Sequence, residues 1–231
     1  MRRVRIVILA KAPIPGFAKT RLISALGAEG AAALAARMLD YIITQALGAG
    51  VDVVELCVTP EIEHPAWEMM SKRAGVVWTN QGEGDLGQRL ARATRRSIKA
   101  GDRVLLIGTD CPELDSNRLS EAAEALRRDD CVIVPSMDGG YVLLGLNRYD
   151  CSLFKNIMWS TETVALETRR RIDRLRWRLT VLPTLHDIDE PEDLIWLPAN
   201  CHVRNPLDDR DRMRPSSISC SALHSITSRK R

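Results

Sequence analysis

A cluster of positive charges follows the first apolar run of the chain. Lys11, Lys19 and Arg21 stand in a short segment in which Pro15 and Gly16 disfavour helix and stiffen a turn. Cations have little reason to gather in a loop unless they hold an anion, and a loop that leads from a strand into a helix also offers backbone N–H groups. The segment therefore predicts a phosphate-binding loop. A solvated turn with incidental basic residues is the alternative.

Acidic residues follow two further apolar runs. Asp110 comes after the run 104–107, at the edge of the sheet where α/β proteins bind ligands. A carboxylate beside a phosphate loop suits Mg²⁺ or Mn²⁺, which take one or two protein carboxylates and complete their coordination with phosphate and water. Asp187 and Asp189 share one side of an extended segment and could approach the same ion. The alternatives are a turn-capping role for Asp110 and a helix N-cap role for Asp189, ahead of Pro191.

Paired glycines separate two predicted strands at Asp138, Gly139 and Gly140. Such a pair allows a tight turn and lets the backbone approach a ligand closely. We take Asp138, together with Lys19 and Asp110, as a candidate catalytic residue, and the two glycines as candidate ligand-binding residues. A plain hairpin turn is the alternative.

Residues 82–87 fit the pattern G-x-G-x-x-G of dinucleotide-binding loops. Glu83 and Asp85 stand inside the loop that would hold a pyrophosphate, and like charges repel strongly in a site of low dielectric constant. This repulsion argues against a dinucleotide. A P-loop is also excluded, because Pro13 and Ala18 occupy the positions of its glycines.

Length and composition indicate a soluble globular protein. The 231 residues favour one domain with elaborations, and the chain is 45% hydrophobic and 27% charged. A net charge of +3 is too weak to indicate nucleic acid as a partner. No apolar stretch approaches the roughly 20 residues that span a bilayer. We therefore expect a cytoplasmic protein with no nucleic acid and no membrane among its partners.

Six cysteines are spread along the chain without a C-x-x-C pair, at Cys57, Cys111, Cys131, Cys151, Cys201 and Cys220. This spacing favours reduced thiols over disulfides or zinc ligands. Cys111 adjoins Asp110, but no histidine stands near it in the sequence. Burial of this thiol is therefore favoured over a nucleophilic role.

Hydrophobic periodicity predicts strands that mostly alternate with helices. Strands are expected at 4–10, 51–58, 76–78, 104–107, 131–135, 141–146 and 178–182, and helices at 29–47, 65–74, 86–99, 117–128 and 161–175. This order predicts an α/β fold of three layers, with a mostly parallel sheet and helices on both faces. Asp115 or Ser116 would cap the helix at 117–128, and Ser160 the helix at 161–175. We expect one domain over 1–198 and a flexible tail over 199–231.

Short motifs occur in order along residues 4–197. They are KAPIPGFAKTRL at 11–22, QGEGDLGQRL at 81–90, GTDCP at 108–112, DGGY at 138–141, WST at 159–161 and DIDEPEDL at 187–194. Together these motifs resemble a glycosyltransferase-A-like family that was once catalogued as a domain of unknown function. Its members are often labelled arsenosugar-biosynthesis-type glycosyltransferases.

This resemblance implies the nucleotide-diphospho-sugar transferase fold, related to that of the nucleotidyltransferases, with a divalent metal as cofactor. It implies that Lys19 and Arg21 hold phosphates, that residues 84–89 border the nucleoside, and that Asp110 and Asp189 bind the metal. The predicted nucleotide-binding residues are Lys11, Pro15, Gly16, Lys19, Arg21, Gly84, Asp85, Gly87, Arg89, Gly139 and Gly140. Gln88 departs from the acid expected at its position.

These inferences favour a metal-dependent glycosyltransferase with a nucleoside diphosphate-sugar as donor and a small molecule as acceptor. A nucleotidyltransferase that acts on a phosphorylated small molecule needs the same loop and metal and is the nearest alternative. A nucleotide-binding protein without turnover is a third hypothesis, which the joint presence of Lys19, Arg21 and Asp110 disfavours. The sequence does not specify the base, the sugar, the acceptor or the oligomeric state.

Overall fold

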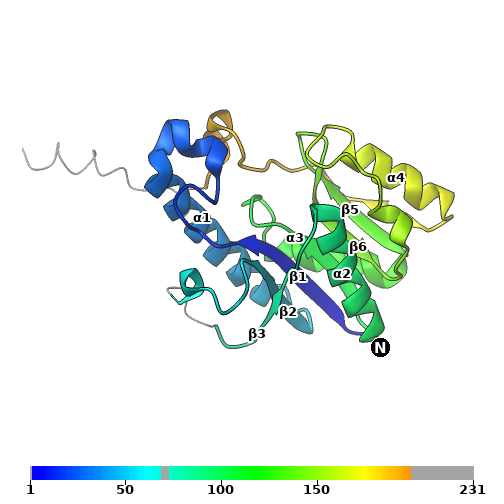
Figure 1. The fold of residues 1–231 in the computed structure, drawn as a ribbon. Helices are drawn as coiled ribbons and strands as arrows, with labels where there is room; N and C mark the ends of the chain where they lie inside the picture. Colours follow the sequence, from blue (N-terminus) through cyan, green and yellow to red (C-terminus); the bar gives the residue numbers. More distant parts are fainter. Residues whose placement is uncertain (1, 69–72, 199–231) are drawn as a thin grey trace, which may run out of the picture.

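A sheet of seven strands forms the centre of the part of the chain that the structure describes (Figure 1). The structure is a computed structural model that describes residues 2–68 and 73–198. The strands are β1 (Val4–Lys11), β2 (Val53–Thr59), β3 (Val76–Asn80), β4 (Arg103–Ile107), β5 (Cys131–Pro135), β6 (Tyr141–Leu146) and β7 (Leu179–Val181). Their order across the sheet is β3-β2-β1-β4-β6-β5-β7.

Within this sheet β6 alone runs against its neighbours. It pairs antiparallel with β4 and β5, whereas β1 pairs parallel with β2 and β4, β2 with β3, and β5 with β7. Gly145 of β6 lies between Leu105 and Val132, and a Cβ at this position would come within 2.4 Å of Val132 Cγ1. Close strand packing therefore requires this glycine. The predicted α/β fold with a mostly parallel sheet is confirmed.

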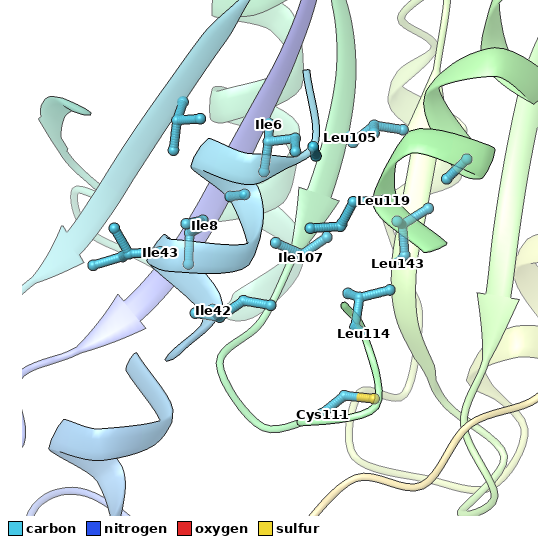
Figure 2. Packing of buried hydrophobic residues seen from close by; sticks show 14 of the residues in the cluster. Ile6, Ile8, Ile42, Ile43, Leu105, Ile107, Cys111, Leu114, Leu119 and Leu143 are labelled. Carbon is cyan, nitrogen blue, oxygen red and sulfur yellow. The ribbon is translucent and has the colours of Figure 1, made fainter. Parts of the chain in front are cut away.

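Helices cover both faces of the sheet. α1 (Ile23–Gly48) and α3 (Ser116–Arg128) pack on one face, where Ile42 and Leu119 meet Ile107 of β4 (Figure 2). α2 (Leu86–Lys99) and α4 (Val164–Arg174) pack on the other face in a second core. The result is the predicted arrangement of three layers.

The central strand β1 is buried on both of its faces. Ile6 and Ile8 belong to the core under α1 and α3, and Val7 belongs to the core under α2 and α4. Successive side chains of a strand point to opposite faces, so a strand covered on both sides needs apolar residues throughout. This is why 4–10 is apolar except for Arg5, whose charge is paired with the buried carboxylates of Glu55 and Asp102.

Side-chain caps mark where α2 and α3 begin. The Asp85 carboxylate accepts the backbone N–H of Gln88, and the Gln88 side chain accepts the N–H of Asp85, which forms a capping box at the start of α2. Asp115 caps α3, as predicted. The prediction for Ser160 is wrong, because Thr163 precedes α4 and Ser160 has a φ of 62°.

Two helical segments differ from the prediction. The helix expected at 65–74 is a short 3₁₀ turn over Pro65–Trp67, and residues 69–72 lie outside the described part. Thr20–Gly48 has the length and composition of a membrane-spanning helix, contrary to the expectation from the sequence. Gly27, with a φ of 71°, interrupts it, and the apolar residues of its inner side are buried against the sheet. This is the packing of a core helix.

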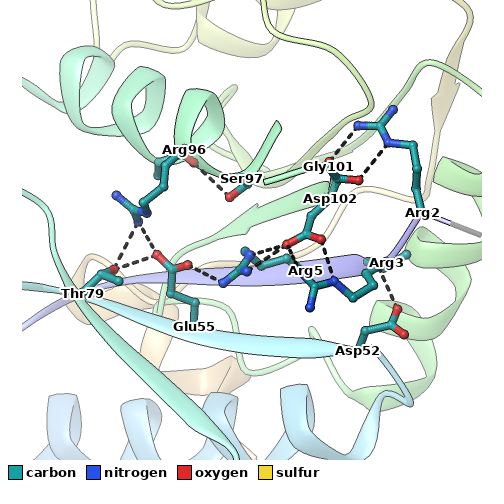
Figure 3. Close-up of polar contacts among 12 residues, drawn as sticks. Arg2, Arg3, Arg5, Asp52, Glu55, Thr79, Arg96, Ser97, Gly101 and Asp102 are labelled. Atoms are coloured by element: carbon teal, nitrogen blue, oxygen red, sulfur yellow. Dashed lines mark hydrogen bonds and ion pairs between the residues drawn. The ribbon is translucent and has the colours of Figure 1, made fainter. Parts of the chain in front are cut away.

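A buried ion-pair network ties α2 to the sheet (Figure 3). Glu55 of β2 is 1% exposed and accepts hydrogen bonds from Arg5, Thr79 and Arg96. Asp102, before β4, is equally buried and also binds Arg5. Each carboxylate has more than one donor, so its burial is compensated. The network fixes α2, and with it the loop that precedes this helix.

The segment after β7 returns to the end of β4. The backbone N–H of Ile188 donates to the carbonyl of Asp110 at 2.8 Å, and the Ile188 side chain packs in a cluster with α1. This places Asp187 and Asp189 beside Asp110, although the sequence separates them widely. The predicted tail at 199–231 lies outside the described residues.

Candidate active site

A cleft of about 680 Å³ opens at the carboxyl ends of β1 and β4. Ligands of open α/β folds bind at this edge of the sheet. The loop after β1, the loop before α2, the residues after β4, the β5–β6 turn and the segments around 160 and 188 line the cleft. It brings together nine of the predicted site residues: Lys11, Lys19, Arg21, Gly84, Arg89, Asp110, Asp138, Gly140 and Asp189.

Lys19 links the cationic loop to the acids. Its ammonium lies 2.5 Å from Asp110 Oδ1 and 3.0 Å from Asp189 Oδ1, and it donates to the carbonyl of Ile188. The side chain is 7% exposed. Burial lowers the pKa of Lys19, but the charges of Asp110 and Asp189 outweigh burial, so the pKa is raised and the ammonium stays charged. The donors of this ammonium thus already have protein acceptors.

Asp187 lacks such a partner: no Lys or Arg side chain in the described ranges forms an ion pair with it. Burial raises the pKa of Asp187 to about 6, and the charges of Asp138, Asp189 and Asp110 add to the rise. The cleft therefore holds more negative charge than Lys19 compensates. A further cation in the cleft would stabilise ionised Asp187.

Lys11 and Arg21 are the more exposed cations of the cationic loop. Arg21 is 57% exposed and lies 3.3 Å from Glu190, which is itself exposed. The Lys11 ammonium lies 6.0 Å from the centroid of the Phe17 ring. These contacts are weak in solvent, so both side chains can turn toward an anion at small energetic cost.

Gln81 fixes the start of the glycine-rich loop, and sequence reasoning did not single it out. Its buried amide donates to the carbonyl of Ala10 on β1 at 3.0 Å and to that of Cys57 on β2 at 2.9 Å. Arg89 donates to the Gln81 side chain and to the carbonyl of Gly84. Arg89 therefore shapes the loop at the cleft as well as lining it.

The β5–β6 turn places Asp138 at the cleft. Its carboxylate accepts the N–H of Gly140 at 2.8 Å and the hydroxyl of Ser136. Gly139 has a φ of 87°, and a Cβ there would lie 2.1 Å from the carbonyl oxygen of Glu162. The hairpin turn weighed as an alternative is thus present, and it packs tightly against the segment before α4.

Five of the predicted ligand-binding residues do not line the cleft: Pro15, Gly16, Asp85, Gly87 and Gly139. Asp85 caps α2, and Gly16 takes a φ of 77° in its turn. A Cβ at Gly87 would meet the carbonyl oxygen of Phe154 at 2.5 Å. These residues give the surrounding loops their shape.

Several residues line the cleft without having been predicted to do so. They are Tyr141, Trp159, Ser160 and Thr161. These residues belong to the DGGY and WST motifs, so the motifs could have identified them. The Tyr141 hydroxyl is buried and has no hydrogen-bond partner in the described part of the chain, and burial raises its pKa.

The N-cap alternative for Asp189 is wrong, because the 3₁₀ helix at Pro191–Trp196 has Glu190 as its N-cap.

None of the four cysteines that the structure describes contributes a nucleophile to this site. The described ones are free, and Cys57, Cys111 and Cys131 are buried while Cys151 is exposed. Burial raises the pKa of Cys111 to about 12, which keeps the thiol protonated at neutral pH. Cys201 and Cys220 lie outside the described residues.

Comparison with known proteins assigns the family. The sequence profile described as "Uncharacterized protein conserved in bacteria (DUF2064)" matches residues 42–161, which is more than half of the chain. The chain belongs to the DUF2064 family. The matched residues include Asp110, Asp138 and the loop before α2.

Solved structures share the fold of this DUF2064 protein. A protein of Desulfovibrio desulfuricans G20, named as a candidate nucleotide-diphospho-sugar transferase, is 27% identical with a TM-score of 0.77, over 84% of this chain and 85% of that one. The 4-diphosphocytidyl-2C-methyl-D-erythritol synthase of Anaerococcus prevotii DSM 20548 is 13% identical with a TM-score of 0.54, over 84% and 96%. A cytidylyltransferase of Leptospira borgpetersenii is 16% identical with a TM-score of 0.52, over 97% and 100%.

The last two likenesses show the fold alone, and no curated protein matches the sequence. They share the nucleotide-diphospho-sugar transferase fold with the more similar relative, and that relative, at 27% identity, makes the DUF2064 chain a transferase. The fold and superfamily expected from the resemblance are confirmed.

Proposed function

We propose that this chain is a divalent-metal-dependent glycosyltransferase that takes a nucleoside diphosphate-sugar as donor and a small molecule as acceptor, in the cytoplasm. One observation carries the proposal: a single cleft at the strand ends holds Lys19 and Arg21 together with Asp110, Asp187 and Asp189. Cations of this kind bind a diphosphate, and carboxylates bind the metal that accompanies it. The name of the 27% identical relative supports a diphosphate-sugar as the donor.

The donor set fits a hard divalent cation such as Mg²⁺ or Mn²⁺. Among the described residues, no three Asp, Glu, His or Cys side chains converge closely enough to form a ready metal site. Mg²⁺ is usually held by one or two carboxylates, with phosphates and water in its other positions. Asp110 and Asp189 would hold the ion, supported by Asp187. The ion would neutralise charge on the departing diphosphate.

Lys19 has a double role in this proposal. In the structure its ammonium neutralises Asp110 and Asp189 and anchors the segment around Ile188. These are the carboxylates assigned to the metal, so the ammonium and the metal compete for the same oxygens. A Lys19 side chain released from these carboxylates would donate to phosphate oxygens beside Arg21.

Nucleotidyl transfer is a second candidate, and the fold shared with cytidylyltransferases supports it. In that reaction a phosphorylated small molecule attacks the α-phosphate of a nucleoside triphosphate, and pyrophosphate leaves. The cationic loop and the carboxylates would serve the same purposes in both reactions. The two reactions differ in their leaving group, which can be measured.

Product analysis tests both candidates. The purified chain is incubated with Mn²⁺ and a panel of sugar nucleotides, or with nucleoside triphosphates and phosphorylated acceptors. Release of nucleoside diphosphate supports glycosyl transfer, and release of pyrophosphate supports nucleotidyl transfer. Asp110→Asn should abolish either activity, and Asp85→Asn, which keeps a capping side chain outside the cleft, is the matched control. Neither product, together with no thermal stabilisation by any nucleotide in Mn²⁺, would reject both candidates.

A further inference from the structure

The face of the molecule covered by α2 and α4 is strongly basic. α2 contains four arginines and one lysine and has no acidic residue. α4 contains four arginines, one glutamate and one aspartate. Both helices pack over the same core, so their outer sides lie on the same face of the sheet (Figure 1).

Some of these cations serve the fold, and others are exposed. Arg96 and Arg171 form ion pairs with Glu55 and Glu167, and Arg92 donates to backbone carbonyls. Arg89 lines the cleft. The remaining five are exposed and form no ion pair within the described ranges: Arg95 and Lys99 on α2, and Arg169, Arg170 and Arg174 on α4. Cations outnumber acids on the two helices, and an excess of one sign of charge produces a potential that reaches into solvent.

The segment between β6 and α4 joins the two helices into one surface. Tyr149 borders a shallow groove along α2 that Arg95 and Lys99 also line. Gly87 of α2 packs against the backbone of Phe154, and Arg171 of α4 donates to backbone carbonyls of the same segment. The exposed cations therefore belong to a continuous surface, which we call the α2–α4 face.

Exposed apolar side chains accompany the cations. Met158 is 77% exposed, Leu166 is 48% exposed and Leu86 is 44% exposed. Leu86 begins α2 and lines the cleft, and Met158 precedes Trp159, which also lines it. Leu166 and Arg170 are four positions apart in α4, so they lie on the same side of the helix. Apolar residues among cations are typical of surfaces that lie at a membrane interface.

The opposite face differs. On α3, Glu121 and Glu124 accompany the arginines, and Arg127 forms an ion pair with Glu124. The excess of cations on the α2–α4 face is therefore local, and a net charge of +3 for the whole chain does not reveal it. The expectation of no membrane partner was based on the lack of an apolar stretch long enough to span a bilayer, and that criterion does not detect a basic surface.

We propose that the α2–α4 face docks onto an anionic lipid bilayer. The exposed arginines and Lys99 contact the anionic headgroups, and Met158 and Leu166 enter the interfacial region. Docking by this face places the mouth of the cleft, with Leu86 at its rim, at the bilayer surface. A nucleic-acid backbone offers the same negative charge but gives no reason for exposed Met158 and Leu166, so the apolar residues favour the bilayer.

Vesicle co-sedimentation of the full chain tests the proposal. The chain should bind vesicles of phosphatidylcholine that also contain phosphatidylglycerol, should not bind phosphatidylcholine alone, and should bind less as salt rises. The variant Arg169→Gln/Arg170→Gln/Arg174→Gln should lose on the order of a hundredfold in vesicle affinity, because each basic residue near an anionic surface contributes about fivefold. Glutamine favours helix almost as well as arginine, and circular dichroism checks the fold.

A charge-matched variant of the other face is the control. Arg118→Gln/Arg127→Gln/Arg128→Gln removes the same charge from α3 and should leave vesicle binding almost unchanged. Residues 199–231 are identical in both variants, so their charges do not affect the comparison. Met158→Gln/Leu166→Gln should weaken the binding that persists at high salt. Equal losses in the two arginine variants, no binding to anionic vesicles, or tighter binding of the α2–α4 face to duplex DNA or RNA than to vesicles would overturn the proposal.

Discussion

Replacement of Asp187 by asparagine should stabilise the ligand-free protein. Asp187 forms no ion pair within the described residues, and burial, Asp138 and Asp189 raise its pKa from 3.8 to about 6. A shift of about two units corresponds to about 3 kcal/mol of unfavourable free energy for the ionised carboxylate. The carboxylate is partly exposed, and solvent screens it, so we expect asparagine to recover about 1–2 kcal/mol at pH 8. The ionised carboxylate then lowers the stability of the fold, and the metal site proposed for the cleft explains its presence there.

The effect of this substitution should depend on pH. A raised pKa in the folded state means that the folded chain binds the Asp187 proton more tightly than the unfolded chain does. The wild-type protein therefore loses stability as pH rises from about 4 to about 6 at this site, and the asparagine variant does not. The difference in Tm between them should grow through this window and stay constant above it, at about 2–8 °C for a domain of this size.

Thermal unfolding followed by circular dichroism, in a chelator and then in Mn²⁺, measures both parts of this prediction. In the chelator the Asp187→Asn variant should unfold at a higher temperature than the wild type at pH 8 and at nearly the same temperature at pH 4. In Mn²⁺ the wild type should gain more stability than the variant, because it keeps the carboxylate. A variant that is no more stable at pH 8, or a difference that does not change with pH, would refute the reasoning.

Three further substitutions probe the contacts that build the cleft. Asp189→Asn should change stability in the opposite direction from Asp187→Asn. It should lower the free energy of unfolding of the apo protein in urea by about 1–3 kcal/mol, because buried Lys19 loses one of its carboxylates. An increase in this free energy would contradict the ion-pair assignment. Glu55→Ala should cost about 3–5 kcal/mol by the same method, because it leaves two arginines without their buried partner, and a loss below about 1 kcal/mol would show that the network is dispensable. Gly139→Ala should lower Tm and weaken nucleotide binding, since its Cβ would overlap the carbonyl oxygen of Glu162 and its φ is positive; unchanged values for both would show that the turn can relax.

The sheet could be predicted well because burial dictates its residues. The central strands β1 and β4 are covered on both faces, so each is an almost uninterrupted apolar run. α2 begins and ends as predicted because its capping box and basic last turn are local signals. Ser160 was misplaced because a serine before a helical pattern does not reveal that its backbone takes a φ of 62°.

The residues of the cleft were easier to predict than their contacts. The types and spacing of the loop after β1 identified Lys19, and the end of β4 identified Asp110. The ion pair between them depends on the packing of the loop, and the Lys19–Asp189 pair joins residues 170 positions apart. Gly87 and Asp85 were assigned to a ligand because glycine and aspartate serve loop geometry and ligands equally well. The packing of Gly87 against Phe154 and the capping bond of Asp85 distinguish these uses.

The effect of the charged residues in this protein depends on where the fold places them, which composition alone does not show. A net charge of +3 spread evenly over the surface would give little attraction to any polyanion. The fold instead places Asp110, Asp187 and Asp189 at the cleft and most arginines of α2 and α4 on one outer face. The sequence shows that α2 has five cations and no acid. It does not show that α4 packs on the same face of the sheet, which follows only from the topology. Since surface potential depends on which helices share a face, the topology decides whether these arginines act together.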